Sequence, residues 1–212
     1  MARLQPAPSP QPVADPDPSR FEKDAQAFAM ADAANPVPPG GILFLGSSSI
    51  RKWDTLAQDF PGLPVLNRGF GGSQMSDAVA LADRLVFPYE PRQIVLYEGD
   101  NDVGAGKSAA QILEDFRDFA REVHTRLPAC RISLLAIKPS PKRKPFAVAL
   151  GEANAVLRKF TETSPLLEYI DIHTPMLGDD GQPRPELFIE DNLHMNAAGY
   201  AIWTAVIRPY LR

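Results

Sequence analysis

The chain has 212 residues, of which 44% are apolar and 23% are charged, with a formal net charge of −4. This composition is ordinary for a globular protein with a sizeable core, and the acidic balance argues against nucleic acid as a partner, because phosphate binding needs a basic face. No stretch approaches the ~20 apolar residues of a transmembrane helix, the N-terminus lacks the pattern of a signal peptide, and the single cysteine excludes an internal disulfide.

Residues 1–20 are rich in proline, alanine and aspartate and offer little that a core could bury. We predict that they form a disordered, extended tail or linker. Residues 21–34 carry apolar side chains at helical spacing, and the prolines and glycines of residues 36–41 end this helix. We therefore predict one folded domain over residues 21–212.

Short apolar runs alternate with helical stretches over the rest of the chain. Most runs are continuous, which is typical of strands buried on both faces. The alternation predicts an α/β fold, a three-layer α/β/α sandwich around a parallel five-stranded, flavodoxin-like sheet, with ligands at the carboxyl ends of the strands. The predicted strands are 42–45, 65–67, 93–97, 131–137 and 168–172, and the predicted later helices are 50–58, 75–86, 109–126, 146–163 and 197–211.

The sequence Gly-Ser-Ser-Ser at residues 46–49 follows the first of these strands and opens a helix. A hydroxyl there is exposed on the binding face, and the backbone N–H groups that follow point at a ligand. These hydroxyls are candidate nucleophiles, provided that a base removes the proton. The alternative is a helix N-cap, a position that serine also favours.

Loops after the second and third strands offer hydrogen-bond donors. Residues 67–73 contain three glycines, whose N–H groups can approach a ligand closely, and Asn101 carries a side-chain amide. The N–H groups of Ser48 and Gly72 and the amide of Asn101 would converge from neighbouring strands on the oxyanion of a tetrahedral intermediate. The alternative is three ordinary turns, in which glycine, asparagine and aspartate are common.

Asp191 and His194 lie just before the last predicted helix. A spacing of three residues lets the carboxylate hold one imidazole nitrogen, while the other nitrogen accepts a serine proton. The alternative is a helix cap with an incidental histidine. We expect His124, His173 and Cys130 to be structural, and because these residues lack zinc-ligand spacing we predict no metal.

Taken in order, these blocks resemble those of the SGNH hydrolases, also called GDSL-type esterases and lipases. The resemblance covers residues 42–211 and is greatest to compact members similar to the platelet-activating-factor acetylhydrolase subunits. It places Ser48 at the nucleophile position, Gly72 in the second block, Asn101 in the third, and Asp191 with His194 in the last.

The resemblance implies ester hydrolysis through an acyl-enzyme, with no cofactor. Ser48 would attack the ester carbonyl, His194 would act as base and Asp191 would orient the imidazole, while the three donors named above form the oxyanion hole. One departure is Ser47, where the family name expects an aspartate. That aspartate is not the catalytic acid, so the change concerns local packing more than catalysis.

The substrate is expected to be a small-molecule ester or an acetylated glycan. Phe70 and Leu193 flank predicted catalytic positions and are candidate substrate-binding residues for an apolar acyl pocket, or else part of the core. The basic residues of the segment Lys138–Lys144 could meet an anionic substrate or form a rim, but a solvated loop is the favoured interpretation. The sequence shows no large apolar lid, which favours short acyl groups.

Two other classes of function compete with a serine esterase. A phosphate or nucleotide binder could use the two glycine-containing loops, but the chain lacks a full dinucleotide fingerprint or a Walker lysine, and Asp191 and His194 would have no role. A non-catalytic ligand-binding relative could share the fold, and within the esterase class a carbohydrate O-deacetylase is the main alternative. The sequence indicates neither an oligomeric state nor a compartment.

Overall fold

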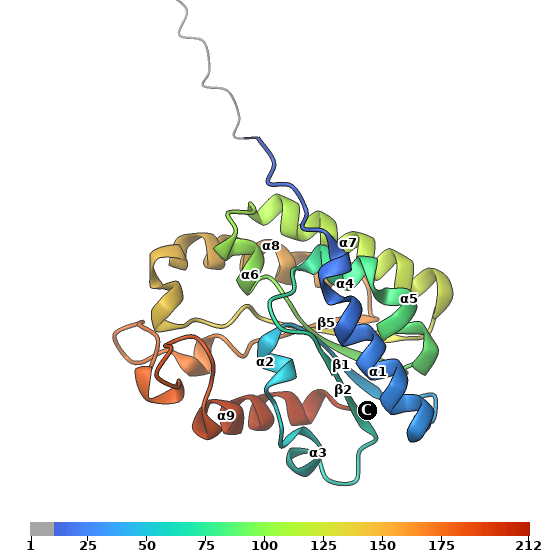
Figure 1. The fold of residues 1–212 in the computed structure, drawn as a ribbon. Helices are drawn as coiled ribbons and strands as arrows, with labels where there is room; N and C mark the ends of the chain where they lie inside the picture. Colours follow the sequence, from blue (N-terminus) through green and yellow to red (C-terminus); the bar gives the residue numbers. More distant parts are fainter. Residues whose placement is uncertain (1–10) are drawn as a thin grey trace, which may run out of the picture.

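A computed structural model describes residues 11–212, whose arrangement is shown in Figure 1. Five parallel strands form one sheet in the order β2-β1-β3-β4-β5, which confirms the predicted α/β fold and the flavodoxin-like order. The strands are β1 (Ile42–Gly46), β2 (Val65–Gly69), β3 (Gln93–Tyr97), β4 (Arg131–Leu135) and β5 (Leu167–Ile170).

Helices cover both faces of the sheet and make the second and third layers (Figure 1). One face carries α1 (Glu22–Ala34), α4 (Met75–Ala80), α5 (Ala82–Leu85), α7 (Ala109–Arg126) and α8 (Ala147–Thr161). The other face carries α2 (Ser48–Arg51), α3 (Leu56–Asp59) and α9 (Ala197–Ile207), and the short α6 (Asp100–Gly104) follows β3. Within residues 11–212, no helix combines the length and apolar character needed to cross a membrane.

The side chains of β1 show how the sheet joins the two layers. Leu43 and Leu45 belong to the core on the α7 side, and Ile42 and Phe44 belong to the core on the α9 side. All four are at most 1% exposed. A strand buried on both faces needs apolar residues at every position, which is why its sequence is a continuous apolar run.

Two predicted helices are each divided in the structure. Residues 50–58 form α2 and α3, because Thr55 and the indole N–H of Trp53 both donate to the Asp59 carboxylate at 2.6 Å, and these local bonds replace a continuous helix. Residues 75–86 form α4 and α5, with the break at Leu81.

The predicted strand 131–137 is two residues too long, because Asn154 competes with the sheet for its last backbone groups. The side-chain oxygen of Asn154 accepts the N–H of Ile137 at 2.8 Å, and its amide donates to the Ile137 carbonyl at 3.0 Å. The chain therefore leaves β4 after Leu135.

The segment before α1 lies against the domain. A short 3-10 helix, η1 (Pro18–Phe21), begins where the Asp17 side chain accepts the N–H of Ser19 at 2.9 Å, and Phe21 is buried in the core. Val13, Asp15 and Arg20 contact the domain, within the residues 1–20 that we predicted to be a tail or linker. The rest of that prediction, over residues 1–10, lies outside the described residues.

Candidate active site

The carboxyl end of β1 places the candidate nucleophile. Gly46 has φ of +137°, and a Cβ there would lie 2.0 Å from the Tyr97 carbonyl oxygen, so only glycine allows β1 to pass this close to β3. The chain then turns, Ser47 caps α2, and Ser48 is the first residue of that helix. The Ser48 hydroxyl therefore lies at the edge of the sheet where ligands of parallel sheets bind.

Ser48, His194 and Asp191 form one continuous chain of hydrogen bonds. The Nε2 atom of His194 lies 2.8 Å from Ser48 Oγ, and its Nδ1 atom lies 2.5 Å from Asp191 Oδ2. The other oxygen of Asp191 accepts the backbone N–H groups of Leu193 and His194, each at 2.9 Å. The structure thus brings together three residues that are 146 and three positions apart in sequence.

The charge of Asp191 fixes the roles of the two imidazole nitrogens. Burial alone would raise the pKa of this carboxyl. Hydrogen bonds from the His194 side chain and from two backbone N–H groups have the opposite and larger effect, so the pKa lies well below its ordinary value. An ionised carboxylate can only accept hydrogen bonds, so Nδ1 of His194 carries the proton. Nε2 is then the acceptor that faces the Ser48 hydroxyl.

Gly72 is an exposed glycine whose backbone N–H is a candidate donor. Its φ is +90°, a conformation that favours glycine, and a Cβ at this position would meet no atom within 4 Å. Among the residues that the structure describes, its N–H has no acceptor, while its carbonyl accepts from Arg20 at 3.5 Å. The N–H of Gly72 is therefore available to a ligand.

Asn101 lies in the first turn of α6, next to Ser47. Its Nδ2 donates to Ser47 Oγ at 2.9 Å and to the Ser73 carbonyl at 2.8 Å. The same Ser47 hydroxyl accepts the N–H of Ser48 at 2.6 Å. Two of the three predicted oxyanion donors thus converge on one buried hydroxyl oxygen, a role for Ser47 that the sequence analysis did not assign.

The two residues predicted to line an acyl pocket differ in their surroundings. Phe70 is 0% exposed and packs edge-to-face on Phe21, with ring centroids 5.0 Å apart. This side chain belongs to the core rather than to the wall of an open pocket. Leu193 is half-buried and lies between Asp191 and His194 in sequence.

The basic segment after β4 is not uniformly solvated. Lys138 is 1% exposed and lies 2.6 Å from Asp100, and Arg143 reaches the other oxygen of Asp100 at 2.5 Å. Burial raises the pKa of Asp100, but the charges of Lys138 and Arg143 lower it below its ordinary value. Two of the four basic side chains therefore hold the start of α6, whereas Lys142 and Lys144 are exposed.

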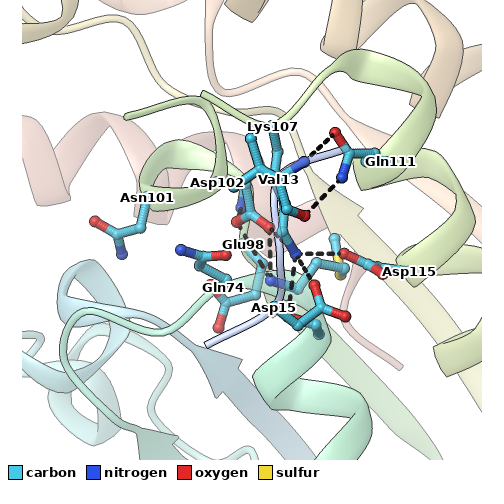
Figure 2. A network of polar contacts seen from close by, with 12 residues as sticks. Val13, Asp15, Gln74, Glu98, Asn101, Asp102, Lys107, Gln111 and Asp115 are labelled. Carbon is cyan, nitrogen blue, oxygen red and sulfur yellow. Dashed lines mark hydrogen bonds and ion pairs between the residues drawn. The ribbon is translucent and has the colours of Figure 1, made fainter. Parts of the chain in front are cut away.

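Two buried acidic side chains, Glu98 and Asp102, contact the loops that follow β2 and β3 (Figure 2). Glu98 is 0% exposed and accepts the Ser73 hydroxyl at 2.5 Å. Asp102 is also 0% exposed and accepts the N–H groups of Met75 at 3.0 Å and Gly99 at 3.1 Å. Burial raises the pKa of Asp102 to about 6. Asp102 thereby caps the N-terminus of α6, a role that the sequence analysis did not assign.

We expect Glu98→Gln to change how stability depends on pH. Burial, and then the charge of Asp102, hold the pKa of Glu98 well above its usual 4.5. As the pH rises past 4.5 the unfolded chain loses this proton first, so the contribution of Glu98 to wild-type stability falls by about 1.4 kcal/mol per pH unit until its folded pKa is reached. A neutral glutamine removes this loss.

Urea unfolding at pH 5, 6.5 and 8 measures the effect. The unfolding free energy of Glu98→Gln minus that of the wild type should increase as the pH rises. For Glu152→Gln, at an exposed position, the same difference should not change with pH. A difference that stays constant across the three pH values would contradict the assignment of a raised pKa to Glu98.

The remaining histidines and the cysteine contact backbone rather than Ser48. Nε2 of His124 lies 3.1 Å from the Cys130 carbonyl, and Nδ1 of His173 lies 2.8 Å from the Ile137 carbonyl. Cys130 is buried, and burial raises the pKa of its thiol to about 12, so it is a poor nucleophile. Within residues 11–212, no group of three or more histidine, cysteine and acidic residues is placed to hold a metal ion.

Comparison with known families agrees with this geometry. Residues 41–202 match the GDSL-like lipase/acylhydrolase family, and this match covers the sheet, the Ser48 turn and the Asp191–His194 pair. The chain belongs to this family. Membership supports a general activity of ester hydrolysis. No curated protein matched the sequence.

Solved structures of the same fold include several members of this family. A proposed platelet activating factor from Streptococcus pneumonia has 22% identity and a TM-score of 0.80, with 90% of this chain and 92% of that chain covered. A GDSL-like lipase from Bacteroides thetaiotaomicron has 19% identity, a TM-score of 0.74 and coverages of 88% and 96%. A variant of an acetyl-xylooligosaccharide esterase from Geobacillus Stearmophilus has 17% identity, a TM-score of 0.66 and coverages of 81% and 94%. At these identities the likeness establishes the fold.

Proposed function

We propose that the protein is a serine esterase that hydrolyses carboxylic esters with short acyl groups through an acyl-enzyme on Ser48. The observation that carries this proposal is the chain of hydrogen bonds from Asp191 through His194 to Ser48, at 2.5 and 2.8 Å. A hydroxyl, an imidazole held in one tautomer and a carboxylate are the parts that activate a serine for acyl transfer.

In the proposed reaction, Ser48 Oγ forms a bond to the ester carbonyl carbon while its proton moves to Nε2 of His194. The carbonyl oxygen becomes an oxyanion, and its collapse breaks the ester bond. His194 then donates its proton to the leaving alkoxide, which departs as an alcohol. Water repeats the sequence on the acyl-enzyme and releases the acid, with Asp191 stabilising the imidazolium in both halves.

The oxyanion would bind the N–H groups of Ser48 and Gly72 and the amide of Asn101. Gly72 has an available N–H, whereas Ser48 N–H and the Asn101 amide donate to Ser47 in the free protein. A charged oxygen is a stronger acceptor than a neutral hydroxyl, so the intermediate can compete for these two donors. The donors then stabilise the charge where it develops.

The surface near His194 favours small acyl groups. Three large apolar side chains are exposed among residues 11–212, namely Met30, Val148 and Ile189. Of these, Ile189 lies close to His194, since its N–H donates to the His194 carbonyl at 2.9 Å. Leu193, which is half-buried, is the other candidate apolar contact near His194, and these two side chains suit a short acyl group better than a long one.

A carbohydrate O-deacetylase is a second candidate. It would use the same Ser48 chemistry on an acetyl ester of a sugar. The similarity in fold to an acetyl-xylooligosaccharide esterase supports it, since that protein shares the sheet and its layers with this chain. The two candidates differ in the alcohol that leaves, which p-nitrophenyl esters and acetylated sugars distinguish.

Labelling with a fluorophosphonate and hydrolysis of p-nitrophenyl acetate, butyrate and octanoate test the proposal together. We expect the label on the peptide that contains Ser48 and faster hydrolysis of acetate and butyrate than of octanoate. Labelling of Ser48 with turnover of acetylated sugars alone would favour the deacetylase. A chain that takes no label would be a non-catalytic binding protein, and faster hydrolysis of octanoate would contradict the short acyl preference.

A further inference from the structure

The N-terminal segment, defined as residues 11–20, contacts the Gly72 loop through Arg20 and the chain that follows α6 through Val13 and Asp15. Figure 2 shows Val13 and Asp15 beside Lys107 and Gln111, which follow α6 and begin α7. The Gln111 side chain donates to the Val13 carbonyl at 2.9 Å and accepts the Val13 N–H at 3.4 Å. These two bonds hold Val13 against the first turn of α7.

Asp15 supplies one partner of a buried cation. The Lys107 side chain is 0% exposed, and its Nζ lies 2.6 Å from Asp15, 2.8 Å from Asp115 and 3.7 Å from Asp102. A buried ammonium is costly unless it is paired, so these carboxylates define where Lys107 lies. Removing Asp15 leaves Lys107 with Asp115, with the Ser76 hydroxyl at 3.1 Å and with Asp102, so the ammonium must find a new position among these three.

Asp102 connects this cation to the oxyanion loops. Its carboxylate accepts the N–H of Met75, at the start of α4, and the N–H of Gly99, at the start of α6. Asn101 lies between Gly99 and Asp102 in the first turn of α6. A movement of Asp102 towards Lys107 would therefore tilt the turn that presents the Asn101 amide.

Arg20 makes the second connection, to the loop of Gly72. Its guanidinium donates to the Gly72 carbonyl at 3.5 Å and forms an ion pair with Asp77, which in turn accepts the N–H of Gln74 at 2.8 Å. The next residue, Phe21, packs on Phe70. Arg20 thus holds the peptide between Gly72 and Ser73, which is the next one along the chain from the peptide that carries the Gly72 N–H.

We infer that the N-terminal segment is a positioning element of the active site, in which Asp15 orients Asn101 through Lys107 and Asp102, and Arg20 orients the Gly72 loop. The inference rests on the proposed roles of these two donors in ester hydrolysis. Asp15 is 59% exposed in its side chain and Lys107 keeps Asp115 as a partner at 2.8 Å, so the fold should survive the loss of Asp15 and the effect should be on geometry. Sequence analysis missed this role because residues 1–20 resemble a linker in composition.

Point variants of the full-length chain test the inference. For Asp15→Asn we expect kcat for p-nitrophenyl acetate to fall about tenfold with KM within twofold, because misplaced donors weaken transition-state binding more than substrate binding. Asp15→Glu, which keeps the charge, should recover at least half of the lost kcat. Asp24→Asn removes the same charge from α1, where Asp24 has no ion-pair partner among residues 11–212, and should match the wild type.

Arg20→Gln tests the second connection in the same way, with a similar fall in kcat. Its matched control is Arg117→Gln, which removes a surface guanidinium paired with Glu114 on α7. Wild-type kcat in both Asp15→Asn and Arg20→Gln would overturn the inference.

A spectroscopic measurement separates this inference from the proposed function. In ¹⁵N-labelled full-length protein, Asp15→Asn should shift the side-chain amide signals of Asn101, and Arg20→Gln should shift the N–H signal of Gly72, whereas Asp24→Asn should shift neither. Unchanged signals would overturn the inference even in an active enzyme. If the wild type hydrolyses no ester and takes no fluorophosphonate, the proposed function fails, and the amide signals still decide whether the segment positions these two groups.

Discussion

Replacing Ser48 with alanine is expected to lower kcat/KM for p-nitrophenyl acetate on the order of 10⁶-fold, the scale of losing a serine nucleophile. The hydroxyl is the only group that bridges His194 to the ester carbon in the proposed mechanism, and its loss leaves His194 without a proton to accept. The fold should be retained, because α2 is capped by Ser47 rather than by Ser48.

Initial rates over a range of ester concentrations give kcat/KM for wild type and variant, and circular dichroism checks the fold. Ser164→Ala removes a hydroxyl near the amino end of β5, at the opposite end of the sheet, and should keep the wild-type rate. A fluorophosphonate should label the wild type and the Ser164→Ala variant but not the Ser48→Ala variant. Equal turnover by Ser48→Ala and wild type would show that another group performs the hydrolysis.

The fold and the hydrogen-bonded trio were accessible from sequence because their signals are local. Continuous apolar runs predict strands buried on both faces, and the structure places these runs in one parallel sheet. Asp191 and His194 are three residues apart, so one turn brings their side chains together without help from the rest of the fold. Gly46 marks the strand end that carries Ser48, because no other residue fits beside Tyr97.

Contacts between distant residues could not be predicted in the same way. Lys138 and Arg143 read as part of a solvated basic loop, yet both pair with Asp100, 38 and 43 residues away. Asn154 ends β4 from a helix 17 residues further along the chain. The composition and periodicity of a segment describe that segment alone. They cannot show which charged or amide side chain from elsewhere in the chain will contact it.

The second large effect is expected at Asn101. Replacing Asn101 with alanine should lower kcat for p-nitrophenyl acetate by about 10² to 10³-fold with little change in KM, since removing one oxyanion donor costs about 3 kcal/mol of transition-state stabilisation. The reason is geometric: the amide converges with the Ser48 N–H on the same oxygen, Ser47 Oγ, and the Arg143 guanidinium lies 3.4 Å from its carbonyl oxygen and keeps the amide nitrogen on that side.

Two further variants separate the donor from its structural contacts. Asn101→Asp keeps the size of the side chain but replaces the amide donor with an acceptor, so it should lose at least as much kcat as Asn101→Ala. Asn35→Ala changes an exposed asparagine at the end of α1 and should keep the wild-type rate. Thermal unfolding of each variant shows whether the fold is intact. An Asn101→Ala variant with kcat within twofold of the wild type would remove Asn101 from the oxyanion hole and leave the two backbone N–H groups as its donors.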